Sequence, residues 1–367
     1  MYLARSVDLR QLAERLQATH EVWGPQRAPG SQQVFFDRLV DVDRLRLDDS
    51  LPAMPPKEIF LPQLERILSY RYDRDRQQVS LTPRFEEKRK ALLGLRPCDL
   101  AGLQCLDRFL IGQDFVDEVY LAHRKRTLIV VENCAAPFSD CFCVCTDTGP
   151  AAHEGYDLSL TKLGADEPVY LVDVGSDEGH ALALASNWRQ AGSREIEQKA
   201  AVIDRAVSLF PEVATHNKAW ISRTMNRVTT GFIKPETWEY VGKQCFECGA
   251  CSFVCPSCSC FNIEDVACGS DGWAPQGGCR LGDPACDRMR TRDSCSFEGY
   301  TRMAGDHNPR KPVEDRRNKR FFCKLSYAQS KKYLRPGCVG CGRCAWVCPG
   351  EIGMPNVVKY IHRETRD

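Results

Sequence analysis

Two copies of one cysteine motif constrain this chain more than any other feature of its sequence. Both copies have the spacing Cys-x2-Cys-x2-Cys-x3-Cys-Pro, which is typical of proteins that bind two [4Fe-4S] clusters. The first motif consists of Cys245, Cys248, Cys251, Cys255 and Pro256, and the second of Cys338, Cys341, Cys344, Cys348 and Pro349. The chain is therefore expected to carry electrons.

In two-cluster ferredoxins, the fourth cysteine of each motif binds the cluster of the other motif. We therefore expect one [4Fe-4S] cluster on Cys245, Cys248, Cys251 and Cys348, and a second on Cys338, Cys341, Cys344 and Cys255. This crossed ligation joins the two motifs in one small fold, so residues 256–337 form an insertion within it. Zinc is the alternative, but structural zinc sites use two Cys-x2–4-Cys pairs separated by a spacer, and neither motif has that pattern.

The composition excludes several other classes of protein. The 21 cysteines are an odd number, and residues 1–6 lack the basic and apolar pattern of a signal peptide, so we expect thiolate ligands in a reducing cytoplasm rather than disulfides. The longest aliphatic run is Leu128–Val131 and the mean hydropathy is -0.39, so no membrane span is expected. A net charge of +1 lacks the basic excess of a nucleic-acid-binding protein.

The order of sequence patterns predicts an α/β N-terminal domain followed by an α+β two-cluster ferredoxin-like domain with a long loop-rich insertion. We expect the α/β domain at 1–210, a linker helix at 211–241 and the ferredoxin-like domain at 242–367, with the insertion at 256–337. Strands are predicted at 126–131 and 168–174, and helices after Pro97 and at 181–188 and 195–210.

Inside the insertion, two segments have distinct compositions. Residues 268–279 are dense in Gly, Asp and Pro, which predicts a loop. The run 310–320 is charged throughout, which favours a solvated surface, with a docking face as the alternative.

A second group of cysteines lies far upstream of the motifs, where a helix start and a strand end are predicted. Its members are Cys98, Cys134, Cys141, Cys143 and Cys145. Helix N-termini and strand ends supply N–H groups that offset the negative charge of thiolates, so a third metal site is expected here. The alternative is that these residues are buried as small apolar side chains, as free cysteines commonly are.

Several segments together resemble a known family, which comprises the beta subunits of cytosolic sulfhydrogenases and the corresponding iron-sulfur subunits of anaerobic sulfite reductases. The resemblance runs over most of the chain and is carried by Gly94–Leu100, Asp140–Cys143, Gly155–Leu158, Cys255–Phe261, Asp293–Phe297 and Ala304–Arg310. It implies that Cys98, Cys134, Cys141 and Cys143 bind a third [4Fe-4S] cluster and that Cys145 is not a ligand. This chain has Asp140 where the family more often has Thr.

The resemblance also implies the role of the chain. Subunits of this family relay electrons between a flavin- and NAD(P)-binding partner and a catalytic partner, which is a hydrogenase, a sulfite reductase or a heterodisulfide-reductase-type enzyme. No catalytic residue is expected in this chain, because dinucleotide-binding, phosphate-binding and nucleophile-elbow motifs are missing from its sequence. The alternative is a scaffold protein whose clusters only stabilise the fold.

Seven further cysteines match no standard ligand spacing. They are either ordinary loop and core residues or the ligands of a further cluster or zinc site: Cys258, Cys260, Cys268, Cys279, Cys286, Cys295 and Cys323.

Overall fold

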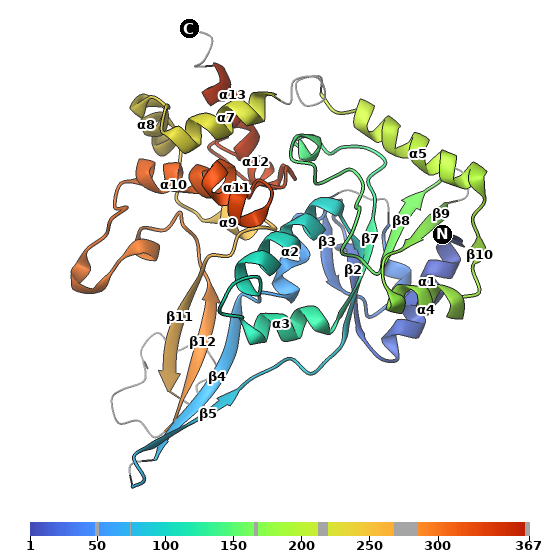
Figure 1. The fold of residues 1–367 in the computed structure, drawn as a ribbon, viewed down its shortest axis with the longest axis horizontal. Coiled ribbons are helices and arrows are strands. Elements are labelled where there is room, and N and C mark those ends of the chain that lie inside the picture. The colour runs from blue at the N-terminus through green and yellow to red at the C-terminus, as the bar shows by residue number, and fades with distance from the viewer. Residues whose placement is uncertain (48–50, 74, 165–167, 212–218, 268–284, 364–367) are drawn as a thin grey trace.

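The computed structural model describes residues 1–367 apart from 48–50, 74, 165–167, 212–218, 268–284 and 364–367 (Figure 1). Its larger sheet is mixed and has the strand order β10-β1-β9-β8-β7-β6-β2-β3. These strands are β1 (Tyr2–Arg5), β2 (Glu21–Arg27), β3 (Val34–Arg38), β6 (Lys90–Leu95), β7 (Thr127–Glu132), β8 (Leu158–Lys162), β9 (Val169–Val174) and β10 (Arg189–Gln190). The expected mixed α/β architecture is confirmed.

Two interior strands of this sheet, β6 and β7, are parallel neighbours. Every residue in both strands is buried. Most of these residues are Leu, Ile, Val or Ala, as expected for parallel strands that are covered on both faces. The strands predicted at 126–131 and 168–174 are confirmed by β7 and β9.

Helices connect the strands and pack on the sheet (Figure 1). They are α1 (Ser6–Gln17), α2 (Pro97–Leu110), α3 (Glu118–Lys125), α4 (Asp177–Ala185) and α5 (Ser193–Ser208). Pro97 starts α2 because its missing N–H is not needed in the first turn. The predicted helices correspond to α2, α4 and α5, although α4 begins and ends earlier than expected.

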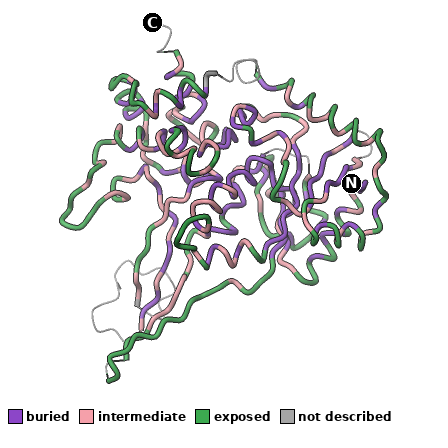
Figure 2. Tube along the Cα trace, in the orientation of Figure 1, coloured by how far each residue is buried: buried purple, intermediate pink, exposed green. Residues whose placement is uncertain are grey.

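A smaller antiparallel sheet joins distant parts of the chain. It contains β4 (Leu64–Asp73), β5 (Gln78–Pro83), β11 (Phe261–Ala267) and β12 (Ala285–Arg292), in the order β11-β12-β4-β5. This sheet projects from the body of the molecule at the lower left of Figure 1, and its outer strand β5 is exposed (Figure 2). The pairing of β12 with β4 fixes the insertion to the N-terminal half of the chain.

The insertion is less loop-rich than its composition indicated. Besides β11 and β12, it contains α10 (Val313–Leu325) and α11 (Tyr327–Tyr333). The loop predicted at 268–279 lies outside the described residues. The expectation of a solvated surface at 310–320 holds only in part: Lys311, Asp315 and Asn318 are exposed, whereas α10 buries Arg316, Arg317 and Arg320. At least two of these cations face cysteine sulfurs.

One cysteine contradicts the expectation that disulfides are missing. Cys286 lies in β12 with an exposed fraction of 0%, and it forms a disulfide whose partner is outside the described residues. Burial in an interior strand shields this disulfide from thiols in solution. The other cysteines in the described part of the chain are free thiols.

The C-terminal part is mainly helical and contains α7 (Ala219–Thr230), α8 (Pro235–Lys243), α9 (Ala250–Phe253), α12 (Arg343–Trp346) and α13 (Met354–Arg363). The described residues of the expected linker helix, 211 and 219–241, thus include two helices, α7 and α8. Side chains from α8, α10 and α13, including Trp238, Phe321 and Val358, share one apolar core. Among the described residues, none of the helices has the length and apolar character needed to cross a bilayer.

Candidate iron-sulfur centres

The two cysteine motifs adopt the same local backbone conformation. In the first motif φ is +54° at Glu247 and +75° at Gly249, and in the second it is +63° and +76° at the equivalent Gly340 and Gly342. A short helix follows each pair, α9 in one case and α12 in the other. These left-handed residues turn the chain tightly, so three cysteines of each motif lie on one compact loop.

Backbone N–H groups point at the sulfurs of both loops. The Glu247 N–H donates to Cys245 Sγ at 3.4 Å, and the Met354 N–H donates to Cys344 Sγ at 3.3 Å. Such hydrogen bonds stabilise anionic thiolates and are a regular feature of iron-sulfur sites. The donor set and its surroundings therefore fit the predicted clusters.

The fourth cysteine of the first motif lies near the second motif. Burial raises the pKa of Cys338, Cys341 and Cys344, and the neighbouring Cys255 adds to the rise in each case. Cys255 belongs to the first motif, so the first motif reaches the cysteines of the second. This proximity agrees with crossed ligation on that side.

The first predicted ligand set is more exposed to solvent than the second. Cys245 and Cys251 lie near each other, whereas Cys248 is exposed to solvent. The segment that follows Cys348 packs against the residue before Cys245, since a Cβ built on Gly350 would lie 2.0 Å from the Gln244 carbonyl oxygen. Binding of Cys348 to this cluster stays a prediction.

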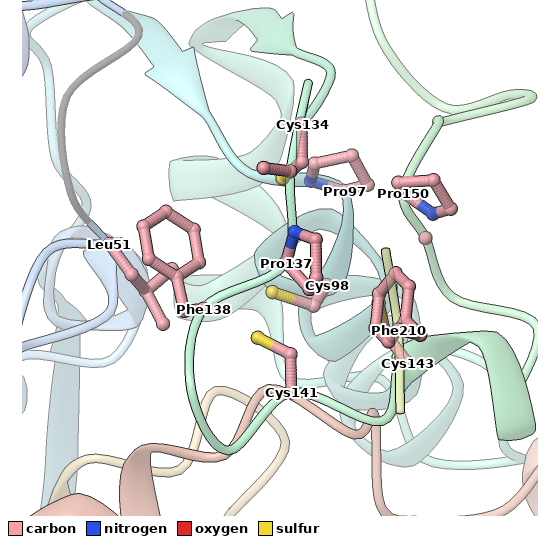
Figure 3. A pocket seen from close by; sticks show the side chains of 12 residues that line it. Leu51, Pro97, Cys98, Cys134, Pro137, Phe138, Cys141, Cys143, Pro150 and Phe210 are labelled. Carbon is pink, nitrogen blue, oxygen red and sulfur yellow. The ribbon is translucent and has the colours of Figure 1, made fainter. Parts of the chain in front are cut away.

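The four upstream cysteines line one pocket (Figure 3). Cys98, Cys134, Cys141 and Cys143 surround it together with Leu51, Phe138, Phe210 and three prolines. In this view the sulfurs of Cys98 and Cys141 lie next to each other. The fifth cysteine of this group, Cys145, is not among the residues that line the pocket.

Sheet topology explains why residues so far apart in sequence meet there. Cys98 follows β6 and Cys134 follows β7, and the two strands are parallel neighbours, so their carboxyl ends share one edge of the sheet. A buried ion pair of 3.3 Å between Arg96 and Glu132 joins the same two strand ends.

The upstream pocket lies directly against the second motif. The Phe142 N–H donates to the Gly340 carbonyl at 2.8 Å, and the Thr148 hydroxyl donates to the Val339 carbonyl at 2.7 Å. Gly340 has no room for a side chain, because an added Cβ would lie 2.6 Å from the Cys143 backbone. The loop of the second motif and the Cys141–Cys143 loop are thus packed backbone to backbone.

A fully buried ion pair reinforces this junction, and no specific signal in the sequence indicated it. Arg343, between two cysteines of the second motif, donates to both carboxylate oxygens of Asp99 at 2.5 and 2.9 Å. Asp99 directly follows Cys98. The pair therefore fixes the second motif to the start of α2.

Four buried cations surround the junction of the first motif with the insertion, and we call them the cation layer: Lys57, Arg317, Arg320 and Lys324. Arg317 contacts Cys251 Sγ and Arg320 contacts Cys258 Sγ, both at 3.7 Å. Lys57 donates to the carbonyl oxygens of Cys255 and Cys258 at 2.7 and 3.1 Å. In the described part of the chain, none of these four side chains forms an ion pair with a carboxylate.

The cation layer changes the ionisation of the thiols that it touches. Burial opposes ionisation of Cys251, but Arg320 and Arg317 outweigh it, and the pKa of Cys251 falls below its ordinary value. A hydrogen bond from Cys258 and the charges of Lys324, Arg320 and Lys57 lower the pKa of Cys255 well below that value. Both thiols are therefore predisposed to the thiolate form that binds iron.

The seven cysteines that match no standard ligand spacing lie in different surroundings. Cys258, Cys260 and Cys295 gather beside the cation layer, and Cys323 lies apart on α10. Cys286 is in the disulfide, and Cys268 and Cys279 are outside the described residues. Within the described ranges, no group of three or more Cys, His, Asp or Glu is arranged around a single metal ion. Cluster ligands need not converge in that way, because each thiolate binds a different iron.

Comparison with known proteins agrees with this geometry. Residues 244–352 match the 4Fe-4S dicluster domain family, a range that contains both motifs. Sulfhydrogenase 2 subunit beta of Pyrococcus furiosus is 27% identical to this chain over 349 residues, which cover 95% of this chain and 94% of that protein. This chain therefore contains a 4Fe-4S dicluster domain and is similar over nearly its whole length to a sulfhydrogenase beta subunit, as its sequence motifs predicted.

Proposed function

We propose that this chain is the iron-sulfur electron-transfer subunit of an oxidoreductase complex. It would relay electrons between a flavin- and NAD(P)-binding partner and a catalytic partner of the hydrogenase, sulfite reductase or heterodisulfide reductase type. The ligands are those predicted above: two crossed sets from the motifs and a third set of Cys98, Cys134, Cys141 and Cys143. Each [4Fe-4S] cluster supplies a one-electron couple.

One observation supports this proposal more than any other, namely that the two motifs and the upstream cysteine loop pack against one another. Cys255 connects the first motif with the second, and α9 packs against α12. The second motif then packs on the Cys141–Cys143 loop, and the charge of Cys341 affects the ionisation of Cys98, Cys141 and Cys143. Close packing of this kind is what a relay through the protein requires.

The similarity to a sulfhydrogenase subunit supports an assembly with other chains, since that relative is by its name one subunit of a larger enzyme. We propose a cytoplasmic location, which the free thiols in the described residues support. We also propose that residues 1–210 and 242–367 are the two cluster-bearing units, with 211–241 between them and the insertion at 256–337.

A scaffold role for the clusters is the competing function. Structural metal sites are typically enclosed, whereas Cys248 is exposed and its neighbour Phe246 has an exposed fraction of 71%. An exposed end of the first motif offers an approach for a redox partner, which a scaffold does not need. We therefore favour the relay.

Reduction of the isolated chain tests the proposal. After anaerobic purification, dithionite should bleach the visible absorbance of the clusters, whereas NAD(P)H should do so only after a flavoprotein partner is added. Clusters that resist reduction by dithionite would support the scaffold instead. Direct reduction by NAD(P)H without flavin would reveal an active site in this chain and contradict the proposal.

A further inference from the structure

Three cysteines that the ferredoxin motifs do not use meet at the base of the β11–β12 hairpin. Cys258 and Cys260 directly precede β11, and Cys295 follows β12. The antiparallel register pairs Phe261 with Arg292, and the Asp293 N–H donates to the Cys260 carbonyl at 3.0 Å. The hairpin therefore brings Cys260 and Cys295 together from distant positions in the sequence.

The side chains of Cys258 and Cys295 meet beside the first motif. Cys295 Sγ lies 3.8 Å from the Ser252 hydroxyl, and Arg320 contacts both that hydroxyl at 3.4 Å and Cys258 Sγ at 3.7 Å. The Cys258 N–H donates to the carbonyl of Cys255, a predicted ligand of the second cluster, at 3.4 Å. Cys258 is buried, and the other two cysteines are partly buried.

The cation layer faces the same place. Arg320 contacts Cys258 Sγ, and Lys324 donates to the carbonyl and the hydroxyl of the adjacent Ser257 at 3.0 and 2.9 Å. Charged side chains are buried only when an opposite charge compensates them. In the described residues no carboxylate pairs with this layer, which instead contacts sulfurs of both the first motif and the three cysteines, at Cys251 and Cys258.

We propose that Cys258, Cys260 and Cys295 bind an additional [4Fe-4S] cluster beside the two ferredoxin-type clusters. Three thiolates on a cubane make an anionic group, and Arg320, which contacts Cys258 Sγ, lies where it would stabilise that charge. The fourth iron is left to a ligand other than cysteine.

Two other assignments are separated from a cluster by experiment. A single zinc ion on the same three sulfurs would carry the same net charge, but it would contain neither iron nor sulfide. A redox-active pair of Cys260 and Cys295 alone would leave unexplained both the third cysteine and the cation that contacts its sulfur.

The additional cluster would adjoin both ferredoxin-type sites. Cys295 Sγ lies 3.8 Å from the hydroxyl of Ser252, the residue after the ligand Cys251, and Cys258 contacts Cys255. A role for the additional cluster in electron transfer rests on the function proposed above. The binding of iron by these cysteines does not depend on that function, so iron binding and electron transfer are tested separately.

The experiment compares iron and sulfide in the anaerobically purified full chain with those in the double variant Cys260→Ser, Cys295→Ser. We expect the double variant to lose about four irons and four sulfides per chain while the EPR signals of the ferredoxin-type clusters persist. Cys323→Ser is the matched control, because this cysteine lies on α10 outside the set, and it should lose none. An unchanged iron content in the double variant would overturn the proposal.

A second measurement needs no variant and covers the case in which the double variant does not fold. In the native, iron-loaded chain, Cys258, Cys260 and Cys295 should resist alkylation by iodoacetamide, and they should react after an iron chelator has removed the clusters. Alkylation of Cys260 and Cys295 in the iron-loaded chain, or their recovery as a disulfide, would contradict cluster binding. A native chain without any iron would contradict the proposed function as well.

Discussion

The two ferredoxin-type motifs have the same spacing and the same backbone turns, yet their surroundings are opposite. In the first motif Cys248 is exposed, and Arg317 and Arg320 lower the pKa of Cys251. In the second motif Cys338 and Cys341 are buried, and burial raises the pKa of both. Local sequence thus sets the shape of each loop, while the tertiary environment sets its electrostatics.

This contrast has a consequence for the redox potentials of the two clusters. Reduction adds a negative charge, which nearby cations and water stabilise and an apolar interior does not. The first cluster, whose ligand Cys251 contacts Arg317 and whose ligand Cys248 is open to solvent, is therefore expected to have the higher potential. Four experiments, in order of decreasing effect, test whether the two motifs differ in this way.

Removal of the fourth cysteine of a motif gives the largest effect, the loss of a whole cluster. Cys348→Ala should remove the cluster bound by the first motif, and Cys255→Ala the one bound by the second, each with about four irons per chain. Redox titration followed by EPR should show the higher-potential signal missing only in Cys348→Ala. A structure in which each motif binds its own cluster with all four of its cysteines would contradict the crossed assignment.

The buried ion pair of the second motif should be the most important single contact for stability. Asp99→Asn leaves Arg343 buried without its counter-charge, which should cost about 3–5 kcal/mol of unfolding free energy. Chemical unfolding under anaerobic conditions measures it. The control is Asp306→Asn, which breaks an exposed pair with Arg302 and should cost less than about 1 kcal/mol. Equal losses of unfolding free energy in the two variants would mean that the buried pair stabilises the protein no more than an exposed pair does.

The exposure of the first motif should also increase the rate at which a chelator removes iron from its cluster. With an iron(II) chelator in excess, about four irons per chain should leave roughly tenfold faster than the rest, because the first motif is open to solvent. The fast phase should be missing in Cys348→Ala. A single phase for all of the iron would show that the exposure of Cys248 does not control access to the cluster.

Removal of one cation should have the smallest effect and should be confined to the first motif. Arg317→Gln takes away the guanidinium that contacts Cys251 Sγ, so the potential of the first cluster should fall by about 50 mV, the equivalent of about 1 kcal/mol for one electron. Lys319→Gln is the control, because this lysine packs over the Phe322 ring on the same helix. A shift in the second cluster instead would reverse the expected difference between the motifs.

Much of the upstream site could be predicted because its geometry follows from local rules. The run Leu128–Val131 is apolar and β-branched enough to form a strand, and Pro97 marks the start of a helix. Because β6 and β7 are parallel neighbours, Cys98 and Cys134 meet at one sheet edge, and the four expected cysteines line one pocket. That they bind a cluster stays a prediction.

The cation layer could not be predicted, because its pattern in sequence is that of a solvated surface. Arg317 and Arg320 belong to a run of charged residues whose composition favours exposure. Lys57 comes from the opposite end of the chain, and local sequence gives no sign that it lies beside Cys255 and Cys258. Local sequence also gives no sign that Asp99 and Arg343 form an ion pair, because they are 244 positions apart.

The amino-acid sequence by itself determines the cofactor class, the ligand spacing and the tight turns of both motifs, because these depend on residues within a few positions of one another. Three other properties arise only when the chain is folded: which motif is buried, which cations face sulfur, and which unused cysteines meet at the base of the β11–β12 hairpin. The physical reason is that charge compensation and burial act through space. The residues that compensate a charge or bury a motif can therefore come from any part of the chain, and spacing along the sequence does not predict which residues they are.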